Sequence, residues 1–204
     1  MIPQEVYGSY NNATKKVSYL VSKRYFIDKS PNKKVKTIIF LGGSQGSKAI
    51  NSFALKIANK LDDMGINIIH QTGKNSEKDI KQRYEDMGMS VDIFGFSTKL
   101  FDKLKTADIA VCRAGAGTVW ELCAMGLPAI FVPYPYAASN HQYFNAKFLK
   151  DLNLCEIIDE QDLNIDKLMK FINTDISILS KKLTKLIDKN GTDDMIDDIL
   201  KETR

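Results

Sequence analysis

The first regular segment of the chain is an apolar run over residues 35–41, VKTIIFL, which ends at Gly42 and Gly43. A continuous apolar run bounded by glycine is typical of a strand that is buried on both faces of a parallel sheet. Beyond the sequence GGSQGS, apolar residues recur at the spacing of an amphipathic helix: Ala49, Ile50, Phe53, Ile57 and Leu61. The pattern therefore predicts a strand, a glycine turn and a helix in succession.

The same alternation continues along the chain. Further strands are predicted at residues 66–73, 90–94, 108–112 and 129–133. Helices are predicted between and after them, at residues 76–87, 96–107, 117–125 and 141–152. Strands that alternate with helices at this spacing imply right-handed crossovers and a parallel sheet. We therefore expect a Rossmann-like α/β domain over residues 36–160, with helices on both faces of its sheet.

The two flanking segments are less regular. Residues 161–204 have helical, amphipathic patterns, with one apolar set near Leu168 and a second that continues to Ile187. Asn190 and Gly191 are predicted to stop the second helix, and Thr192 to cap a last one. Residues 1–35 form an N-terminal extension or interdomain remnant. Within it, residues 15–26 fit a helix or a strand, and residues 30–32 read as a linker.

Composition narrows the class of protein. A chain of 204 residues that is 44% hydrophobic suits one domain with extensions, and no apolar run approaches the roughly 20 residues that span a bilayer. We expect a soluble protein. Three cysteines without CxxC spacing favour buried, reduced thiols and a cytoplasmic location. The net charge is only +4, yet basic residues gather near the N-terminus, as a solvated face or one that meets an anionic membrane: Lys15, Lys16, Lys23, Arg24, Lys29, Lys33, Lys34 and Lys36.

The glycine turn at residues 42–47 has the composition of an anion site. Its glycines allow backbone amides to approach a phosphate, Ser44 adds a hydroxyl, and the next helix directs its positive end there. A tight turn without a ligand explains the glycines equally well. The sequence is neither GxGxxG nor a P-loop, which argues against a dinucleotide oxidoreductase and an NTPase.

A second glycine turn, AGAG at residues 114–117, precedes another predicted helix. Glu121, one turn into that helix, could accept both hydroxyls of a ribose, or could simply complement the helix dipole. Asn140, His141 and Gln142 suit sugar hydroxyls better than a metal. Neither histidine of the chain has the surroundings of a zinc ligand, and His70 ends a strand without an evident partner. We interpret Trp120, Tyr134 and Tyr136 as packing residues.

Several of these motifs occur together in one family. GGSQGS, HQTGK at 70–74, CRAGAGTVWELCAMGLPAIFVPYP at 112–135 and NHQYFNA at 140–146 resemble the donor-binding, C-terminal half of the MurG family. The resemblance covers residues 36–160. It implies one half of a GT-B fold, and a glycosyltransferase of family 28 that moves N-acetylglucosamine (GlcNAc) from UDP-GlcNAc onto lipid I to form lipid II of peptidoglycan. It also implies inversion at the anomeric carbon, with no metal and no cofactor.

The resemblance also implies roles for individual positions. Ser44 and the backbone of residues 116–118 would hold the diphosphate, Glu121 the ribose, and Gln142 the GlcNAc hydroxyls. The backbone near Phe96 would border the uracil. Whether Arg113 contacts ligand or protein stays open, and His141 stands where the family often has glutamine. The complete set of expected UDP-GlcNAc contacts is Gly43, Ser44, Gln45, Gly46, Phe96, Ser97, Arg113, Ala116, Gly117, Thr118, Glu121, Asn140, His141 and Gln142.

The departures from the family pattern limit the expected activity. The family's N-terminal domain binds the lipid acceptor, carries the membrane-facing patch and supplies the catalytic base, and residues 1–35 show no counterpart of it. We therefore expect a donor-binding half that is inactive alone, with its catalytic residues unknown. The full enzyme would lie at the inner face of the membrane, without a nucleic-acid partner. The alternatives are a subunit of a split glycosyltransferase, a UDP-sugar epimerase or hydrolase, and a non-catalytic nucleotide-sugar-binding module.

Overall fold

The computed structural model describes residues 2–3, 16–28, 30–189 and 191–202. Its centre is a parallel sheet with strand order β5-β4-β3-β6-β7-β8. The strands are β3 (Thr37–Leu41), β4 (Asn67–Gln71), β5 (Asp92–Phe94), β6 (Ile109–Cys112), β7 (Ala129–Phe131) and β8 (Glu156–Ile157). The predicted Rossmann-like α/β fold is confirmed, and β8 is an addition to the predicted strands.

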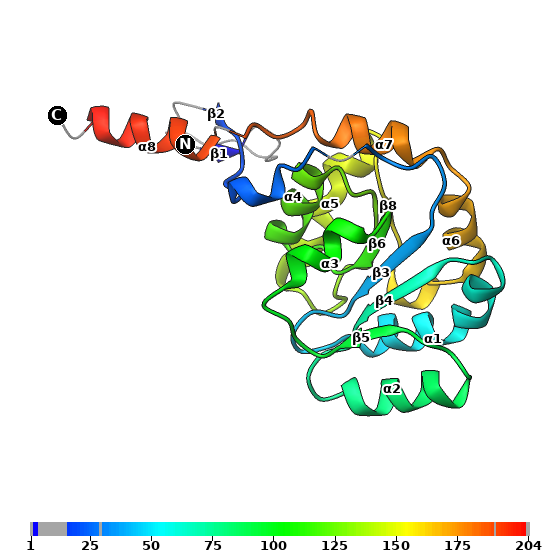
Figure 1. Ribbon diagram of the computed structural model, residues 1–204. Helices are drawn as coiled ribbons and strands as arrows, with labels where there is room; N and C mark the ends of the chain where they lie inside the picture. The colour runs from blue at the N-terminus through cyan, green and yellow to red at the C-terminus, as the bar shows by residue number, and fades with distance from the viewer. Residues whose placement is uncertain (1, 4–15, 29, 190, 203–204) are drawn as a thin grey trace.

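Helices cover both faces of this sheet (Figure 1). They are α1 (Lys48–Asp63), α2 (Glu77–Asp86), α3 (Leu100–Thr106), α4 (Ala116–Met125), α5 (His141–Asp151), α6 (Ile165–Ile172), α7 (Ile176–Leu183) and α8 (Gly191–Glu202). Helices α1, α2 and α6 share one hydrophobic core with the sheet, and α3, α4 and α5 share the other. Short 3-10 turns occur at Lys23–Tyr25, Ala138–Asn140 and Glu160–Asp162, and β1 (Ile2–Pro3) pairs with β2 (Lys16–Val17).

Strand β3 shows why its apolar run is continuous. Ile38 and Phe40 point into the core shared with α1, whereas Ile39 and Leu41 point into the core shared with α4. All four are buried. Because successive side chains of a strand alternate between faces, a strand covered on both sides needs apolar residues at every position.

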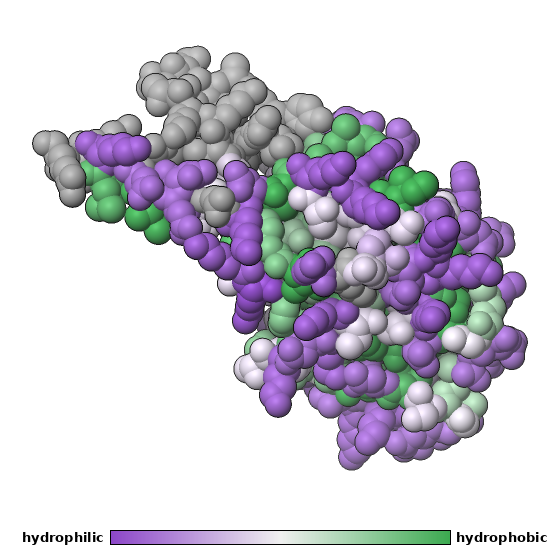
Figure 2. Space-filling model, turned by 45° about the horizontal axis from the view of Figure 1, so that its top comes forward, coloured by the Kyte–Doolittle hydropathy of each residue, from purple (hydrophilic) through white to green (hydrophobic). Residues whose placement is uncertain are grey.

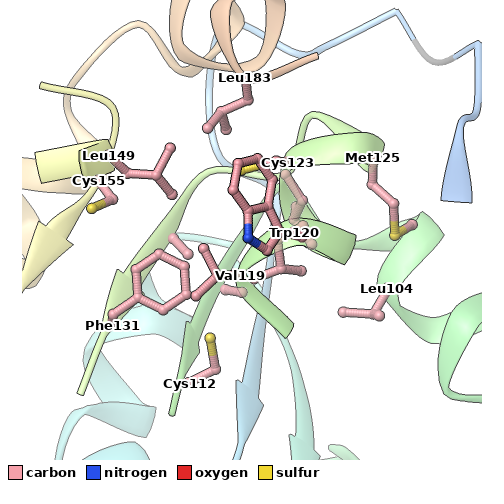
Figure 3. Packing of buried hydrophobic residues seen from close by; sticks show 14 of the residues in the cluster. Leu104, Cys112, Val119, Trp120, Cys123, Met125, Phe131, Leu149, Cys155 and Leu183 are labelled. Atoms are coloured by element: carbon pink, nitrogen blue, oxygen red, sulfur yellow. The ribbon is translucent and has the colours of Figure 1, made fainter. Parts of the chain in front are cut away.

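Trp120 of α4 lies at the centre of the second core. Its indole stacks between the rings of Tyr19 and Phe148, with centroids 5.5 Å and 4.9 Å away. Figure 3 shows Leu183 of α7 pointing toward the same indole. The packing role predicted for Trp120 is therefore confirmed. The same prediction is wrong for Tyr134 and Tyr136, which are 44% and 83% exposed, because both lie in the loop after β7.

The C-terminal segment packs on the sheet domain. Leu168 and Ile172 of α6 enter the first core, and Leu183 enters the second. Helix α7 ends at Leu183, earlier than predicted; Ile187 is still buried, but in the turns that follow. The last helix begins at Gly191, so Thr192 is a helical residue and not the cap preceding the helix. The predicted stop at Asn190 lies outside the described residues.

The N-terminal segment is neither the helix nor the longer strand that its pattern allowed. It forms the two-residue β2 and the 3-10 turn at Lys23–Tyr25, and buries Val21 and Tyr25 against the second core. Lys23 pairs with Asp193 at 2.6 Å, which holds this segment beside the start of α8 (Figure 1). That contact uses one member of the basic group; Lys15 and Lys29 lie outside the described residues.

The segment before β3 is also fastened to the domain. The carboxylate of Asp108, which is only 6% exposed, accepts hydrogen bonds from the amides of Lys36 and Thr37 at 2.8 Å and 3.0 Å. It also accepts one from the Asn32 side chain at 2.8 Å. The supposed linker at residues 30–32 is therefore held where β3 and β6 begin, at the amino edge of the sheet.

Other sequence predictions have simple outcomes. Helix α3 begins at Leu100 and not at residue 96, because residues 97–99 form a turn in which the Ser97 hydroxyl accepts a hydrogen bond from the Lys99 amide.

The cysteines are free and buried, as predicted, and burial raises the pKa of the Cys112 and Cys155 thiols. The face in Figure 2 is largely hydrophilic, with hydrophobic side chains in separate patches. Within the described ranges, no helix is long and apolar enough to cross a bilayer.

Candidate functional site

The strand order reverses at the carboxyl ends of β3 and β6. The chain leaves β3 toward β4 and β5 on one side, then returns to β6, β7 and β8 on the other. Leu41 and Cys112, the last residues of β3 and β6, are paired in register. Open α/β sheets bind ligands outside the strand ends where the order reverses in this way. Both predicted glycine turns begin at this point.

The turn after β3 requires glycine for two different reasons. Gly43 and Gly46 have positive φ values of 77° and 82°, a region that other residues enter at a cost. At Gly46 a side chain is also sterically excluded, because a Cβ would lie 2.5 Å from the carbonyl oxygen of Thr72. Ser44 and Gln45, at the tip, are exposed, and Ser47 caps α1 by accepting from the Ile50 amide. The turn thus presents its tip to solvent above the start of α1.

The turn after β4 supports the first turn from behind. Gly73 has φ +84°, and a Cβ there would overlap the Gly46 backbone and lie 2.8 Å from the carbonyl carbon of Gln45. The Thr72 amide donates to the Phe94 carbonyl at 3.0 Å. The turn within the sequence HQTGK therefore packs directly behind the GGSQG turn.

The strand end after β5 carries Phe96. Its ring is 53% exposed, and the ammonium group of Lys74 lies 5.1 Å from the ring centroid. The preceding Gly95 is packed closely, because a Cβ there would lie 2.8 Å from the Lys74 Cα. Phe96, just after β5, and Lys74, just after β4, thus lie together at the carboxyl edge of the sheet.

Helix α4 begins at the second glycine turn. Its N-cap is Gly115, which has no side chain to cap the first-turn amides of Ala116, Gly117 and Thr118. The side chain of Asn145 on α5 donates to the carbonyl of Ala114 at 3.0 Å and so fixes the turn. An uncapped helix N-terminus with free backbone approach is suited to an anion.

Glu121 lies one turn into α4, beside the N-terminal segment. Its carboxylate accepts a hydrogen bond from the Tyr25 hydroxyl, to which Arg24 also donates at 3.2 Å. Burial raises the pKa of Glu121, and this hydrogen bond and the Arg24 charge oppose that rise. Arg24 and Tyr25 were not among the predicted site residues, because their position beside Glu121 is set by tertiary packing.

Arg113 makes its observed contacts within the protein. Its guanidinium donates to the carbonyls of Val132 and Pro133 at 3.1 Å and 3.2 Å, and pairs with Glu160. It also lies over the Tyr134 ring, 5.4 Å from the centroid. These contacts tie the ends of β6 and β7 to the segment after β8, which favours the structural reading of Arg113 that the sequence left open.

The loop after β7 brings the third group of predicted residues to the same edge. Ser139 and Asn140 have φ values of 49° and 53°, a left-handed conformation that is uncommon outside glycine and is concentrated at functional sites. Gln142 accepts a hydrogen bond from the Tyr134 amide at 3.0 Å through its side-chain oxygen, and its NH₂ group is a donor. His141, the first residue of α5, is exposed.

The predicted residues therefore come from the loops after β3, β5, β6 and β7, all at the carboxyl edge of the sheet. Among the described residues, no group of three or more His, Cys, Asp or Glu side chains is arranged to hold a metal ion. The edge instead offers hydroxyls, amides and helix N-termini, which suit a phosphorylated ligand.

Comparison with known proteins identifies the chain. Residues 37–198 match the glycosyltransferase family 28 C-terminal domain. The chain belongs to glycosyltransferase family 28. This match reaches beyond the segment covered by the motif resemblance and includes most of the C-terminal helices.

Two longer proteins are similar to this chain in sequence. A protein of Campylobacter jejuni (strain RM1221) is 49% identical over 179 residues, and one of Sulfurovum sp. (strain NBC37-1) is 45% identical over 190. Both are named UDP-N-acetylglucosamine–N-acetylmuramyl-(pentapeptide) pyrophosphoryl-undecaprenol N-acetylglucosamine transferase. The alignments cover 87% and 93% of this chain but 52% and 56% of the relatives. The chain thus spans about half the length of these relatives.

A solved structure agrees with the family assignment. MurG of Acinetobacter baumannii superposes with a TM-score of 0.77 at 28% identity, over 94% of this chain and 57% of that one. A glycosyltransferase of kitacinnamycin shares the fold at a TM-score of 0.62 and 19% identity. The family 28 chain therefore forms a Rossmann-like half of a GT-B fold, as the resemblance implied.

Proposed function

We propose that this chain is the UDP-GlcNAc-binding part of a MurG-type glycosyltransferase, which transfers GlcNAc to lipid I to form lipid II in peptidoglycan synthesis. The observation that carries the proposal is the pair of glycine turns on either side of the strand-order reversal, in a chain of family 28. The names and 45–49% identity of the relatives from Sulfurovum and Campylobacter jejuni support the donor and the acceptor.

The diphosphate would lie between the two turns. Gly43, Ser44, Gln45 and Gly46 would meet it from the end of β3, and the amides of Ala116, Gly117 and Thr118 from the start of α4. An uncapped helix N-terminus places partial positive charge where the leaving UDP gains negative charge, and so stabilises the transition state. In this proposal, the turns act on the departing nucleotide and not on the acceptor.

The remaining groups would bind the nucleoside and the sugar. Glu121 would accept hydrogen bonds from the ribose hydroxyls. The exposed ring of Phe96, together with Ser97, would border the uracil. Gln142, whose oxygen is held by the Tyr134 amide, would donate to a GlcNAc hydroxyl, with Asn140 and His141 beside it. We propose that the full enzyme binds lipid I at the membrane surface through its other half.

Titration calorimetry with the isolated chain tests donor binding. We expect heat with UDP-GlcNAc and much weaker binding of ADP-glucose. ADP-glucose has adenine in place of uracil and glucose in place of GlcNAc, so it would lose the contacts to both groups. The chain alone should transfer no GlcNAc to lipid I. No heat at millimolar UDP-GlcNAc, or equal affinity for both nucleotide sugars, would remove this proposal.

Substitution of Glu121 should separate affinity from stability. We expect Glu121→Gln to weaken UDP binding by about 1 to 3 kcal/mol, because hydrogen bonds to a charged acceptor are lost. The same change should raise the thermal midpoint at pH 7. Burial raises the pKa of Glu121 in the folded state, so its ionisation lowers stability as the pH rises through that pKa, and glutamine does not ionise.

The matched control is Glu85→Gln on α2, an exposed residue 3.9 Å from Lys81, which should change neither property. Calorimetry measures the UDP affinity of both variants. Thermal melts followed by circular dichroism at pH 5 and pH 7 measure their thermal midpoints. Unchanged UDP affinity in Glu121→Gln would show that this carboxylate only complements the start of the helix.

A further inference from the structure

We propose that Asn51 is a positioning residue for the diphosphate-binding turn, acting through the Thr72 carbonyl in a hydrogen-bonded chain that His70 and Tyr84 complete. The inference rests on the proposed function, because it assigns a task to residues beneath the turn that would hold UDP. All four residues are buried, and they belong to α1, β4, the turn after β4 and α2.

The hydrogen bonds that join Tyr84, His70, Asn51 and Thr72 have one consistent set of donors and acceptors. Asn51 donates through Nδ2 to the Thr72 carbonyl at 3.0 Å, which turns its Oδ1 toward His70 Nε2, 3.1 Å away. Since Oδ1 can only accept, Nε2 of His70 must carry the proton. Nδ1 of His70 then accepts from the Tyr84 hydroxyl, 3.0 Å away. The order of donation therefore runs from Tyr84 through His70 to Asn51, and Asn51 donates in turn to Thr72.

Burial keeps this arrangement in one protonation state. It lowers the pKa of His70 to about 3 and raises that of Tyr84, so the imidazole and the phenol are both neutral near pH 7. The ring of Phe40 packs edge-on against His70 from β3, with centroids 5.9 Å apart. A neutral imidazole with a fixed tautomer is a rigid link between α1 and α2.

The series of hydrogen bonds ends at the Thr72 carbonyl, which lies against Gly46 of the turn after β3. The Thr72 carbonyl that Asn51 holds is the atom closest to the side-chain position of Gly46, 2.5 Å from an added Cβ. The Gly42 amide donates to the Gln71 carbonyl at 2.9 Å, one residue earlier. The 71–73 backbone thus contacts the turn at Gly42 and Gly46, on either side of Gly43, Ser44 and Gln45. The Gly46 amide closes the turn by donating to the Gly43 carbonyl at 3.1 Å.

The burial of this group needs a reason beyond stability. Hydrogen-bonded polar groups in a core are costly when any member is unsatisfied, and apolar groups of the same shape can replace a whole pair with little loss. A hydrogen-bonded series of side chains also fixes the direction of the carbonyl to which its last member donates. Here that carbonyl lies against the turn and not in the middle of the core.

Calorimetry of Asn51→Ala with UDP and with uridine tests the proposal. We expect the UDP dissociation constant to rise about tenfold, the effect of one misplaced hydrogen bond, while the uridine constant stays the same. The control Asn59→Ala, at an exposed position of the same helix, should change neither. Equal losses for UDP and uridine, or no loss, would overturn the assignment to the turn.

Nuclear magnetic resonance of the wild-type chain provides a test that does not depend on the variant folding. The His70 ring should show the Nε2–H tautomer, and this resonance should shift with UDP but not with uridine. An Nδ1–H tautomer, or a resonance that UDP leaves in place, would contradict the proposal. If the wild-type chain bound neither compound, the proposed function would fail first, and the tautomer would still report on the hydrogen-bond directions.

Discussion

Gly73→Ala is expected to lower the free energy of unfolding by about 2 to 5 kcal/mol, the sum of left-handed backbone strain and overpacking. Gly73 has φ +84°, and an added Cβ would overlap the Gly46 backbone and lie 2.8 Å from the carbonyl carbon of Gln45. These are backbone atoms of a turn that is itself fixed at both ends, so they cannot rotate away as a side chain would. The variant that remains folded should also bind UDP more weakly.

Gly43→Ala is the matched control for this prediction. Gly43 has a similar φ of +77°, but apart from its two chain neighbours no atom of the described residues lies within 4 Å of an added Cβ. Its cost should therefore be confined to backbone strain, about 1 to 2 kcal/mol. Urea unfolding followed by circular dichroism compares the two variants directly. Equal losses would mean that the contact between the turns adds nothing to the strain.

Asp108→Ala should produce the second large loss, at the opposite edge of the sheet. We expect a decrease of about 2 to 5 kcal/mol in the free energy of unfolding, because the amides of Lys36 and Thr37 lose a charged, buried acceptor. Asn32→Ala removes the third donor and leaves both amides paired, so it should cost about 1 kcal/mol.

The same urea measurement tests this pair, together with UDP calorimetry on the folded variants. Asp108 precedes β6 at the amino edge, whereas the candidate site lies at the carboxyl edge. UDP affinity should therefore be unaffected where Asp108→Ala is folded. A similar loss of stability in the two variants would show that the amides find other partners when the carboxylate is removed.

Local patterns were sufficient to predict most of the fold. The apolar runs at β3, β4, β6 and β7 predict strands because each is covered on both faces, and the positions of the glycine turns follow from them. The sequence does not predict strand β8, because Glu156–Ile157 is too short to show a pattern. The predicted helix continues past the end of α7 because Ile187 is apolar and buried, and an apolar residue that is buried in a turn fits the helical spacing equally well.

The candidate site was predictable in position but not in its contacts. Gly43, Ser44 and Ala116 could be placed because they follow strands, whereas the partner of Arg113 is Glu160, which lies beyond β8. The sequence shows no partner for His70 for the same reason, since Asn51 and Tyr84 come from two other elements. Such pairings depend on how helices pack across the sheet, and neither periodicity nor spacing encodes them directly.

The stacking around Trp120 has a practical consequence. The chain has one tryptophan, and its indole lies between Tyr19 of the N-terminal segment and Phe148 of α5. The neighbouring residue, Glu121, is the expected ribose contact. The tryptophan fluorescence of the protein therefore comes from a single indole of α4, held between the N-terminal segment and α5, an optical reporter that needs no label.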